Sequence, residues 1–183
     1  GICKFIPSEE RFENYDERSI SFRVRFSEAA SVLTSEGNVM FGTSNGVFMF
    51  NPDSIRKSSY VPPIVFGKLM VNNEDVTPGK ASILKVDLDD TEKLVLSHDE
   101  NIFSVQYAAL DYTNPQNIQY AYILDGFEKQ WTLADKQRSV TYTNLPKGNY
   151  VFRVRSTNSD GAWVENERML DIVILPSFWE TPV

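Results

Sequence analysis

The densest group of side chains that could bind a metal ion is the acidic stretch VDLDDTE at residues 86–92. Carboxylate oxygens are the hard donors that calcium prefers. The stretch lacks the loop glycine and the length of an EF-hand, so a solvated acidic turn is the favoured interpretation, with calcium binding left open. No metal site is predicted. The carboxylates concerned are those of Asp87, Asp89, Asp90 and Glu92.

Nucleophilic catalysis would depend on very few residues. His98 is the single histidine and lies beside Asp99 and Glu100, which favours an exposed position in a turn. Cys3 is the single cysteine, so no internal disulfide is possible, and we expect it to pack as a small hydrophobic residue in a strand. The one G-x-S-x-G run, at residues 42–46, falls in an expected hairpin and not between a strand and a helix, and the sequence has no glycine-rich phosphate loop. We therefore predict no catalytic residue and no cofactor in this chain.

Composition excludes further classes of function. The chain has 183 residues and a net charge of −7, from 18 basic and 25 acidic residues. An acidic chain without a Lys/Arg cluster lacks the electrostatic surface needed to bind nucleic acid or an anionic membrane. A hydrophobic content of 42% is enough for a real core, and no apolar run is long enough to span a bilayer.

The elements that organise the chain are strands rich in aromatic residues between residues 119 and 163. Tyrosines and phenylalanines recur there at period two, which places their rings on one face of each strand. Asp125-Gly126 and Asp160-Gly161 are predicted tight turns, and residues 145–148 (LPKG) form a corner. Beyond the corner, residues 150, 152 and 154 alternate with 151, 153 and 155, as in a half-buried antiparallel strand.

This stretch resembles the three-tyrosine (Y_Y_Y) domain, an immunoglobulin- or fibronectin-like sandwich of bacterial sensor histidine kinases. Leu145, five residues before Tyr150, suits a tyrosine corner, so we expect the Tyr150 hydroxyl to bond to nearby backbone. The tyrosines are interpreted as core and corner residues, not as ligand contacts, and the ligand-binding residues stay unknown. The residues that carry the resemblance are Tyr120, Tyr122, Gly126, Trp131, Tyr142, Leu145, Gly148, Tyr150, Gly161 and Trp163.

The first sixty residues contain an internal repeat. GICKFIP at residues 1–7 aligns with GVFMFNP at residues 46–52, and a period near 45 residues is typical of propeller blades. Strands are expected at 12–15, 29–34 and 38–43, with hairpin turns at Glu36-Gly37 and Asn45-Gly46. The run from 37 to 55 resembles the last blade of the two-component regulator propeller. Its repeat residues are Gly42, Gly46, Phe50 and Pro52.

The predicted fold is all-β, an immunoglobulin/fibronectin III-like sandwich preceded by a partial propeller blade. Residues 1–60 are assigned to the blade remnant, 61–176 to the sandwich and 177–183 to a juxtamembrane segment. Pro62-Pro63 forces the chain at the boundary to be extended. Sandwich strands are expected at residues 64–71, 93–96, 102–110, 118–124, 131–134, 139–143, 150–157 and 169–175.

The resemblance implies a function for the parent protein. Such proteins are hybrid sensor histidine kinases with propellers in the periplasm, one membrane helix and a dimeric cytoplasmic kinase. It implies as partners the rest of the propeller, a second copy of the parent, and an oligosaccharide bound at the full propeller. A transmembrane helix is expected just after Val183, with Phe178 and Trp179 near the headgroups. The alternative is a carbohydrate-binding or accessory sandwich module of a secreted glycoside hydrolase, which would need exposed, coplanar aromatic rings.

Overall fold

The computed structural model describes residues 2–15, 25–54 and 58–177, and it is all-β, as predicted. The chain divides into two compact units, residues 1–59 and 60–183. Among the described residues, no helix is long and apolar enough to cross a membrane. The first unit contains β1 (Ile2–Ile6), β2 (Arg11–Tyr15), β3 (Phe26–Leu33), β4 (Val39–Thr43) and β5 (Gly46–Phe50).

The sequence repeat of the first unit is also a structural repeat. β1 is followed by a short 3₁₀ helix that begins at Pro7, and β5 is followed by one that begins at Pro52. Proline suits the first position of a helix because its fixed φ is helical and its missing N–H would have no partner there. β1 pairs with β2, and β3, β4 and β5 form an antiparallel sheet, with Gly37 and Gly46 at positive φ in the two predicted turns.

A bulge in β3 explains why residue 42 is a glycine. The register between β3 and β4 breaks between Phe26 and Ser31, and Ala29 in the bulge has a left-handed φ of 55°. The bulge brings the Ala30 side chain over β4. A Cβ added to Gly42 would lie 2.7 Å from the Ala30 Cβ, which is closer than two non-bonded carbon atoms can approach.

The described part of the first unit has no buried core of its own. None of its residues whose side chains the structure describes is buried. Phe26, Phe41, Phe48 and Phe50 gather their rings in one partly exposed cluster, while Val47 and Met49 are 62% and 56% exposed. The expectation that Cys3 packs inside the fold is wrong, because it lies in β1 but is exposed on this uncovered hairpin.

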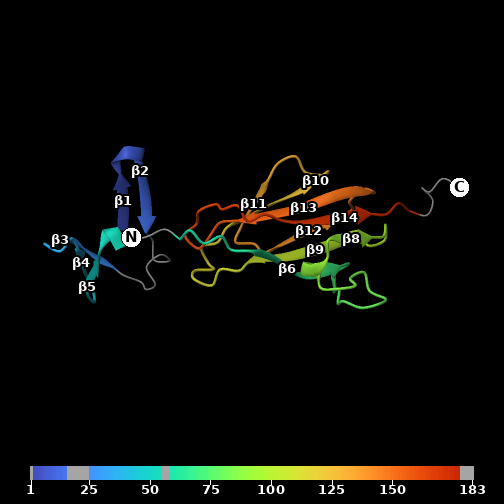
Figure 1. The fold of residues 1–183 in the computed structure, drawn as a ribbon, viewed down its shortest axis with the longest axis horizontal. Coiled ribbons are helices and arrows are strands. Elements are labelled where there is room, and N and C mark those ends of the chain that lie inside the picture. The colour runs from blue at the N-terminus through green and yellow to red at the C-terminus, as the bar shows by residue number, and fades with distance from the viewer. Residues whose placement is uncertain (1, 16–24, 55–57, 178–183) are drawn as a thin grey trace. The chain divides into compact units, whose positions relative to one another are not determined.

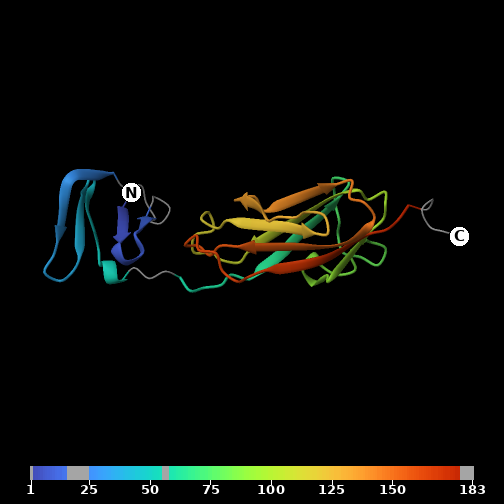
Figure 2. The ribbon, with the colours of Figure 1, turned by 90° about the horizontal axis from the view of Figure 1, so that it is seen from above.

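The second unit is a two-layer β-sandwich (Figures 1 and 2). One sheet has the order β11-β10-β13-β14-β8 and the other the order β12-β9-β6-β7. β8 pairs in parallel with β14, and the other pairs are antiparallel. The strands are β6 (Ile64–Val71), β7 (Glu74–Asp75), β8 (Lys93–Leu96), β9 (Ile102–Ala109), β10 (Tyr120–Asp125), β11 (Thr132–Asp135), β12 (Ser139–Thr143), β13 (Gly148–Ser156) and β14 (Arg168–Ile174).

Phe152 of β13 occupies the centre of the core between the two sheets. Its ring centroid lies 6.0 Å from that of Phe66 and 6.1 Å from that of Tyr107, both on the opposite sheet. The predicted alternation holds, since Tyr150, Phe152 and Val154 are all buried. Complete burial of one such ring contributes about 1.5–3 kcal/mol, so strands with several of them hold the two layers together.

The chain joins the second unit at one end of the sandwich and leaves it at the other. Residues 60–63, here called the linker, precede β6 at the end where β9 stops and β14 starts (Figure 1). β14 then runs the length of the sheet to Ile174, which pairs with Gly148 and Leu96 at the far end. We call these the linker end and the exit end.

Candidate functional site

The buried polar side chains of the described residues gather at the linker end. Burial of a polar group is unfavourable unless it is hydrogen-bonded, so such a concentration marks a place where geometry is specified by hydrogen bonds. Six residues make up this set, here called the linker-end cluster: Asp111, Ser156, Thr157, Asn158, Ser159 and Asn166.

Asn166 connects the linker to the sandwich. Its Nδ2 donates to the Pro62 carbonyl oxygen over 2.8 Å and to Ser156 Oγ over 2.7 Å. Its Oδ1 accepts from the Ser156 backbone N–H over 3.0 Å. Both donors and the acceptor of one buried amide are therefore used, and one of these bonds reaches the linker.

Asp111 organises the loop that follows β9. Its Oδ1 accepts from the Thr113 N–H over 3.0 Å, and its Oδ2 accepts from the Ser159 N–H over 3.1 Å. Burial by itself would raise the pKa of Asp111, but the hydrogen bonds from Thr113 and Ser159 outweigh it and hold that pKa below its usual value. The charged carboxylate thus ties the loop after β9 to the loop after β13.

The loop after β13 is shaped by its own side chains. Asn158 Oδ1 accepts from the N–H groups of Asp160 and Ala162 over 3.1 and 3.0 Å, and Gly161 has a φ of +77°. Thr157 Oγ1 accepts from the Gln119 N–H over 2.9 Å, just before β10. The predicted turn at Asp160-Gly161 is confirmed, and the preceding polar residues fix it to the start of β10.

Two further hydrogen bonds hold the linker to the end of β9. The Tyr60 hydroxyl donates to the Leu110 carbonyl oxygen over 3.1 Å. The Leu110 N–H donates to the Pro63 carbonyl oxygen over 2.9 Å. Together with the bond from Asn166 to the buried Pro62, these contacts fix both ends of the linker to the sandwich.

Tyr150 forms the predicted corner at the exit end. Its hydroxyl donates to the Pro146 carbonyl oxygen over 2.8 Å, and Leu145 beside it is buried. The ring lies between two glycines. A Cβ at Gly126 would come within 3.1 Å of Tyr150 Cδ1, and one at Gly148 within 3.2 Å of its hydroxyl oxygen. The corner therefore explains why both neighbouring positions are glycine.

The other tyrosines also belong to the interior. The buried Tyr120 hydroxyl accepts from the Ala109 N–H over 3.1 Å, while Tyr122 is half-buried against the core. The Tyr142 hydroxyl donates to Glu128 Oε2 over 3.3 Å. Burial, followed by the charge of Glu128, raises the pKa of Tyr142, so the phenol stays neutral at physiological pH.

Trp131 and Trp163 meet around an arginine on the outer face of the five-stranded sheet. The Arg155 guanidinium carbon lies 4.3 Å from the ring centroid of Trp131 and 5.3 Å from that of Trp163. Arg153 lies 5.4 Å from Trp131 and forms ion pairs with Glu167 and Asp125. Both indole rings are thus engaged in cation–π contacts, unlike the free coplanar rings that a sugar-binding platform requires.

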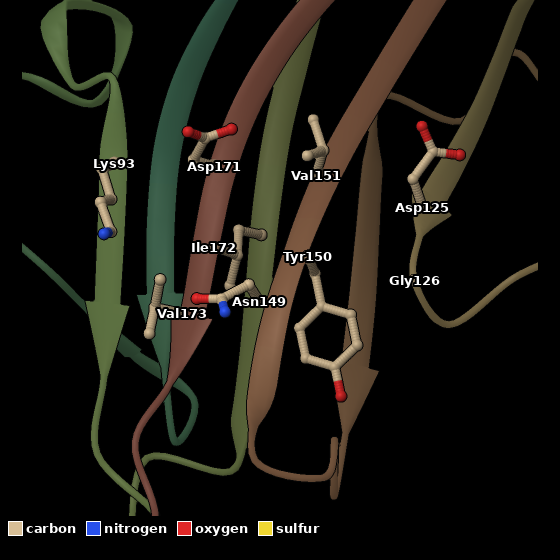
Figure 3. A pocket seen from close by; sticks show the side chains of 9 residues that line it. All are labelled: Lys93, Asp125, Gly126, Asn149, Tyr150, Val151, Asp171, Ile172 and Val173. Atoms are coloured by element: carbon tan, nitrogen blue, oxygen red, sulfur yellow. The ribbon is translucent and has the colours of Figure 1, made fainter.

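A shallow groove of about 460 Å³ crosses β13 and β14 near the exit end (Figure 3). Figure 3 shows the carboxylates of Asp125 and Asp171 on either side of Val151, with Lys93 on the neighbouring strand β8. Asp125 is already paired with Arg153. The lining residues include no histidine, cysteine or serine, so the groove holds no Ser–His or Cys–His pair.

The acidic stretch and His98 belong neither to the linker-end cluster nor to the tyrosine corner. Asp89 Oδ1 accepts from the Phe66 N–H over 2.8 Å and lies 3.3 Å from Arg168 Nη2. Among the described residues, no three His, Cys, Asp or Glu side chains are grouped to hold a metal ion. His98 is exposed in a turn, as predicted.

Comparison with protein families bears directly on this arrangement. The Y_Y_Y domain family matches residues 111–175, a range that starts at Asp111 and contains the whole linker-end cluster as well as the tyrosine corner. Residues 111–175 are thus similar to the Y_Y_Y domain. The resemblance predicted from the sequence is therefore confirmed.

Similar proteins extend the comparison to the rest of the chain. Histidine kinase P4 of Formosa agariphila is 28% identical over 182 residues, which are 99% of this chain and 13% of that protein. The extracellular domain of BT3049 from B. thetaiotaomicron, described as a hybrid two component system, is 28% identical with a TM-score of 0.76. That match covers 94% of this chain and 23% of the other.

A second extracellular domain, that of the hybrid two component system BT4673 from B. thetaiotaomicron, is 25% identical with a TM-score of 0.60 and covers 85% of this chain and 21% of that one. This chain therefore spans less than a quarter of each relative named here. The solved relatives are extracellular domains of two-component sensors, which confirms the predicted extracytoplasmic location and gives no support to the glycoside hydrolase alternative.

Proposed function

We propose that this chain is the membrane-proximal sensor segment of a hybrid two-component histidine kinase, and that its Y_Y_Y sandwich relays ligand binding at a propeller to a membrane helix. The observation that carries this proposal is that the chain enters the sandwich at the linker end and leaves it at the exit end. The linker is hydrogen-bonded at one end of the sandwich, and β14 delivers the chain to the opposite end. A displacement of the linker must then pass through the whole sandwich.

The first unit supports the same proposal. Residues 1–60 contain a strand followed by a 3₁₀ helix twice, which supports assignment to a repeating propeller, and their described side chains bury no core. A blade depends on neighbouring blades for burial, so the rest of a propeller is its natural partner. The oligosaccharide ligand would bind to the complete propeller. Residues 61–176 would be the transmitting sandwich, and residues 177–183 would lead to the membrane helix.

Catalysis is assigned to other parts of the parent protein. The groove of the sandwich holds no Ser–His or Cys–His pair, and the polar cluster is used for structural hydrogen bonds. Phosphorylation and phosphorelay would take place in cytoplasmic domains of the kinase, which works as a homodimer. This segment then contributes to signalling through its position and stiffness, and it catalyses no step of the phosphorelay.

The test replaces the linker in the full-length sensor. Residues 60–63 are changed to Gly-Ser-Gly-Ser, which keeps the length but removes the Tyr60 hydroxyl and the stiff proline pair. We expect ligand binding by the propeller and basal autophosphorylation to persist while ligand-dependent expression of a reporter is lost. The matched control makes the same replacement at residues 77–80, in a loop far along the chain from the linker. Normal induction after the linker replacement would refute the proposal.

A further inference from the structure

The linker makes different contacts with the two sheets. Its hydrogen bonds from Tyr60 and to Pro63 both end at Leu110, which follows β9 of the four-stranded sheet. The bond to the Pro62 carbonyl comes from Asn166, two residues before β14 of the five-stranded sheet. Of these three described bonds, only the one from Asn166 reaches the strand that leads to the exit end.

We infer that Asn166 is a positioning residue that couples the linker to β14, and we call its hydrogen bond to Pro62 the linker latch. This inference rests on the proposed function and names the contact through which the sandwich would be engaged. The two sheets share no backbone ladder, and β6 is connected to β14 by side-chain packing and by Asp89, whose Oδ1 accepts from the Phe66 N–H and lies 3.3 Å from Arg168 Nη2. The latch is a direct polar connection that avoids that route.

The geometry of the latch makes it sensitive to small movements. The Nδ2 group donates to Pro62 and Ser156 over 2.8 and 2.7 Å, and Oδ1 accepts from Ser156 over 3.0 Å. Because the amide is held on three sides and is only 9% exposed, water cannot readily replace a partner that moves away. Displacement of Pro62 therefore either moves the segment before β14 or breaks a buried hydrogen bond.

Asn166→Asp is the sharpest test because it replaces the side-chain nitrogen Nδ2 by an oxygen and keeps the shape of the side chain nearly constant. The new oxygen in the place of Nδ2 cannot donate to the Pro62 carbonyl, whereas Oδ1 can still accept from the Ser156 N–H. The Ser156 hydroxyl can donate to the new oxygen, so contacts inside the sandwich survive. The matched control is Ser156→Ala, which removes a bond of Asn166 within the same cluster but leaves its bond to Pro62.

Both variants are made in the full-length sensor, and ligand-dependent reporter induction is measured. We expect Asn166→Asp to reduce the fold-induction about fivefold or more, the lower range of typical coupling factors, while Ser156→Ala keeps induction near wild type. In this 183-residue chain, hydrogen exchange of the Leu110 amide, which donates to Pro63, and of the β14 amides should rise in Asn166→Asp. If Asn166→Asp does not fold, Asn166→Ser is measured by the same criteria, because its shorter hydroxyl cannot span the distance to Pro62.

Two results would overturn the latch. One is wild-type induction in Asn166→Asp, and the other is an equal loss in Ser156→Ala, which would show that the cluster acts only through stability. The linker replacement described above separates the two proposals. If it abolishes induction while Asn166→Asp does not, the relay stands without the latch. If neither change affects induction, both proposals fail.

Discussion

Tyr150→Phe removes one hydroxyl from the corner and leaves the ring in place. The lost contact is the 2.8 Å hydrogen bond to the Pro146 carbonyl oxygen. A net contribution of about 0.5–1.5 kcal/mol is usual for such a bond, with a larger loss if the carbonyl stays unpaired. For a urea m-value near 2 kcal/mol/M, the unfolding midpoint of the sandwich should fall by about 0.25–0.75 M. Fluorescence-monitored urea unfolding measures this shift directly.

The exposed Tyr112 supplies the matched control. Its side chain is 84% exposed, so Tyr112→Phe should change the free energy of unfolding by no more than about 0.5 kcal/mol. Gly148→Ala gives an independent check, because its Cβ would lie 3.2 Å from the Tyr150 hydroxyl and force the ring to shift. An unchanged midpoint in Tyr150→Phe, or equal shifts in Tyr150→Phe and Tyr112→Phe, would refute the tyrosine-corner argument.

Three other predictions concern charge, ligand binding and assembly. The pKa of Asp111 is lowered on folding, so its contribution to stability is present above about pH 4 and is lost as pH falls through the lower folded pKa. Asp111→Asn should therefore destabilise the sandwich more at pH 7 than at pH 3, and an equal loss in urea midpoint at both would contradict this sign. Calorimetry of this chain against a panel of oligosaccharides should show no specific binding. Micromolar binding that disappears when an aromatic residue of the sandwich is mutated would instead favour a binding module. Any oligomer of the chain should form through residues 1–60, where Val47 and Met49 are exposed, since open strand edges recruit other strands. Light scattering should then show a smaller species for a chain starting at Val61, and the same oligomeric state in both would place the interface in the sandwich.

Strand positions could be predicted because alternation decides which side chains enter the core. Ile64–Val71, Lys93–Leu96 and Ser139–Thr143 have the bounds expected from the sequence. The turns at Gly126 and Gly161 could be predicted because each needs a positive φ, which glycine adopts without steric cost. In the first unit, Phe22 and Val24 are predicted to need cover by a neighbouring element, and they lie outside the described residues, as do Phe178 and Trp179 near the C-terminus.

The linker-end cluster could not be predicted from the same patterns. Asn158, Ser159 and Asn166 have the residue types of exposed loops, and nothing local shows that Ser159 meets Asp111, 48 residues earlier. The runs DYTNPQN and TNSDG were recognisable only as turns. The two-residue strand β7 and the parallel pairing of β8 with β14 were also missed, because neither leaves a periodic signal in the sequence. Burial of these polar groups is a property of the assembled end, not of any single segment.

The apolar core and the linker end of the sandwich respond differently to a small displacement. Between them, the core is held by apolar and aromatic contacts such as those of Phe152, which depend weakly on direction and tolerate slight sliding. Hydrogen bonds weaken steeply when their angle or length departs from the optimum. The linker end, where Asn166 and Asp111 hold three loops by such bonds, is therefore the place where a sub-ångström shift changes the free energy most. A relay that must respond to a change upstream needs that sensitivity at the end where the signal arrives.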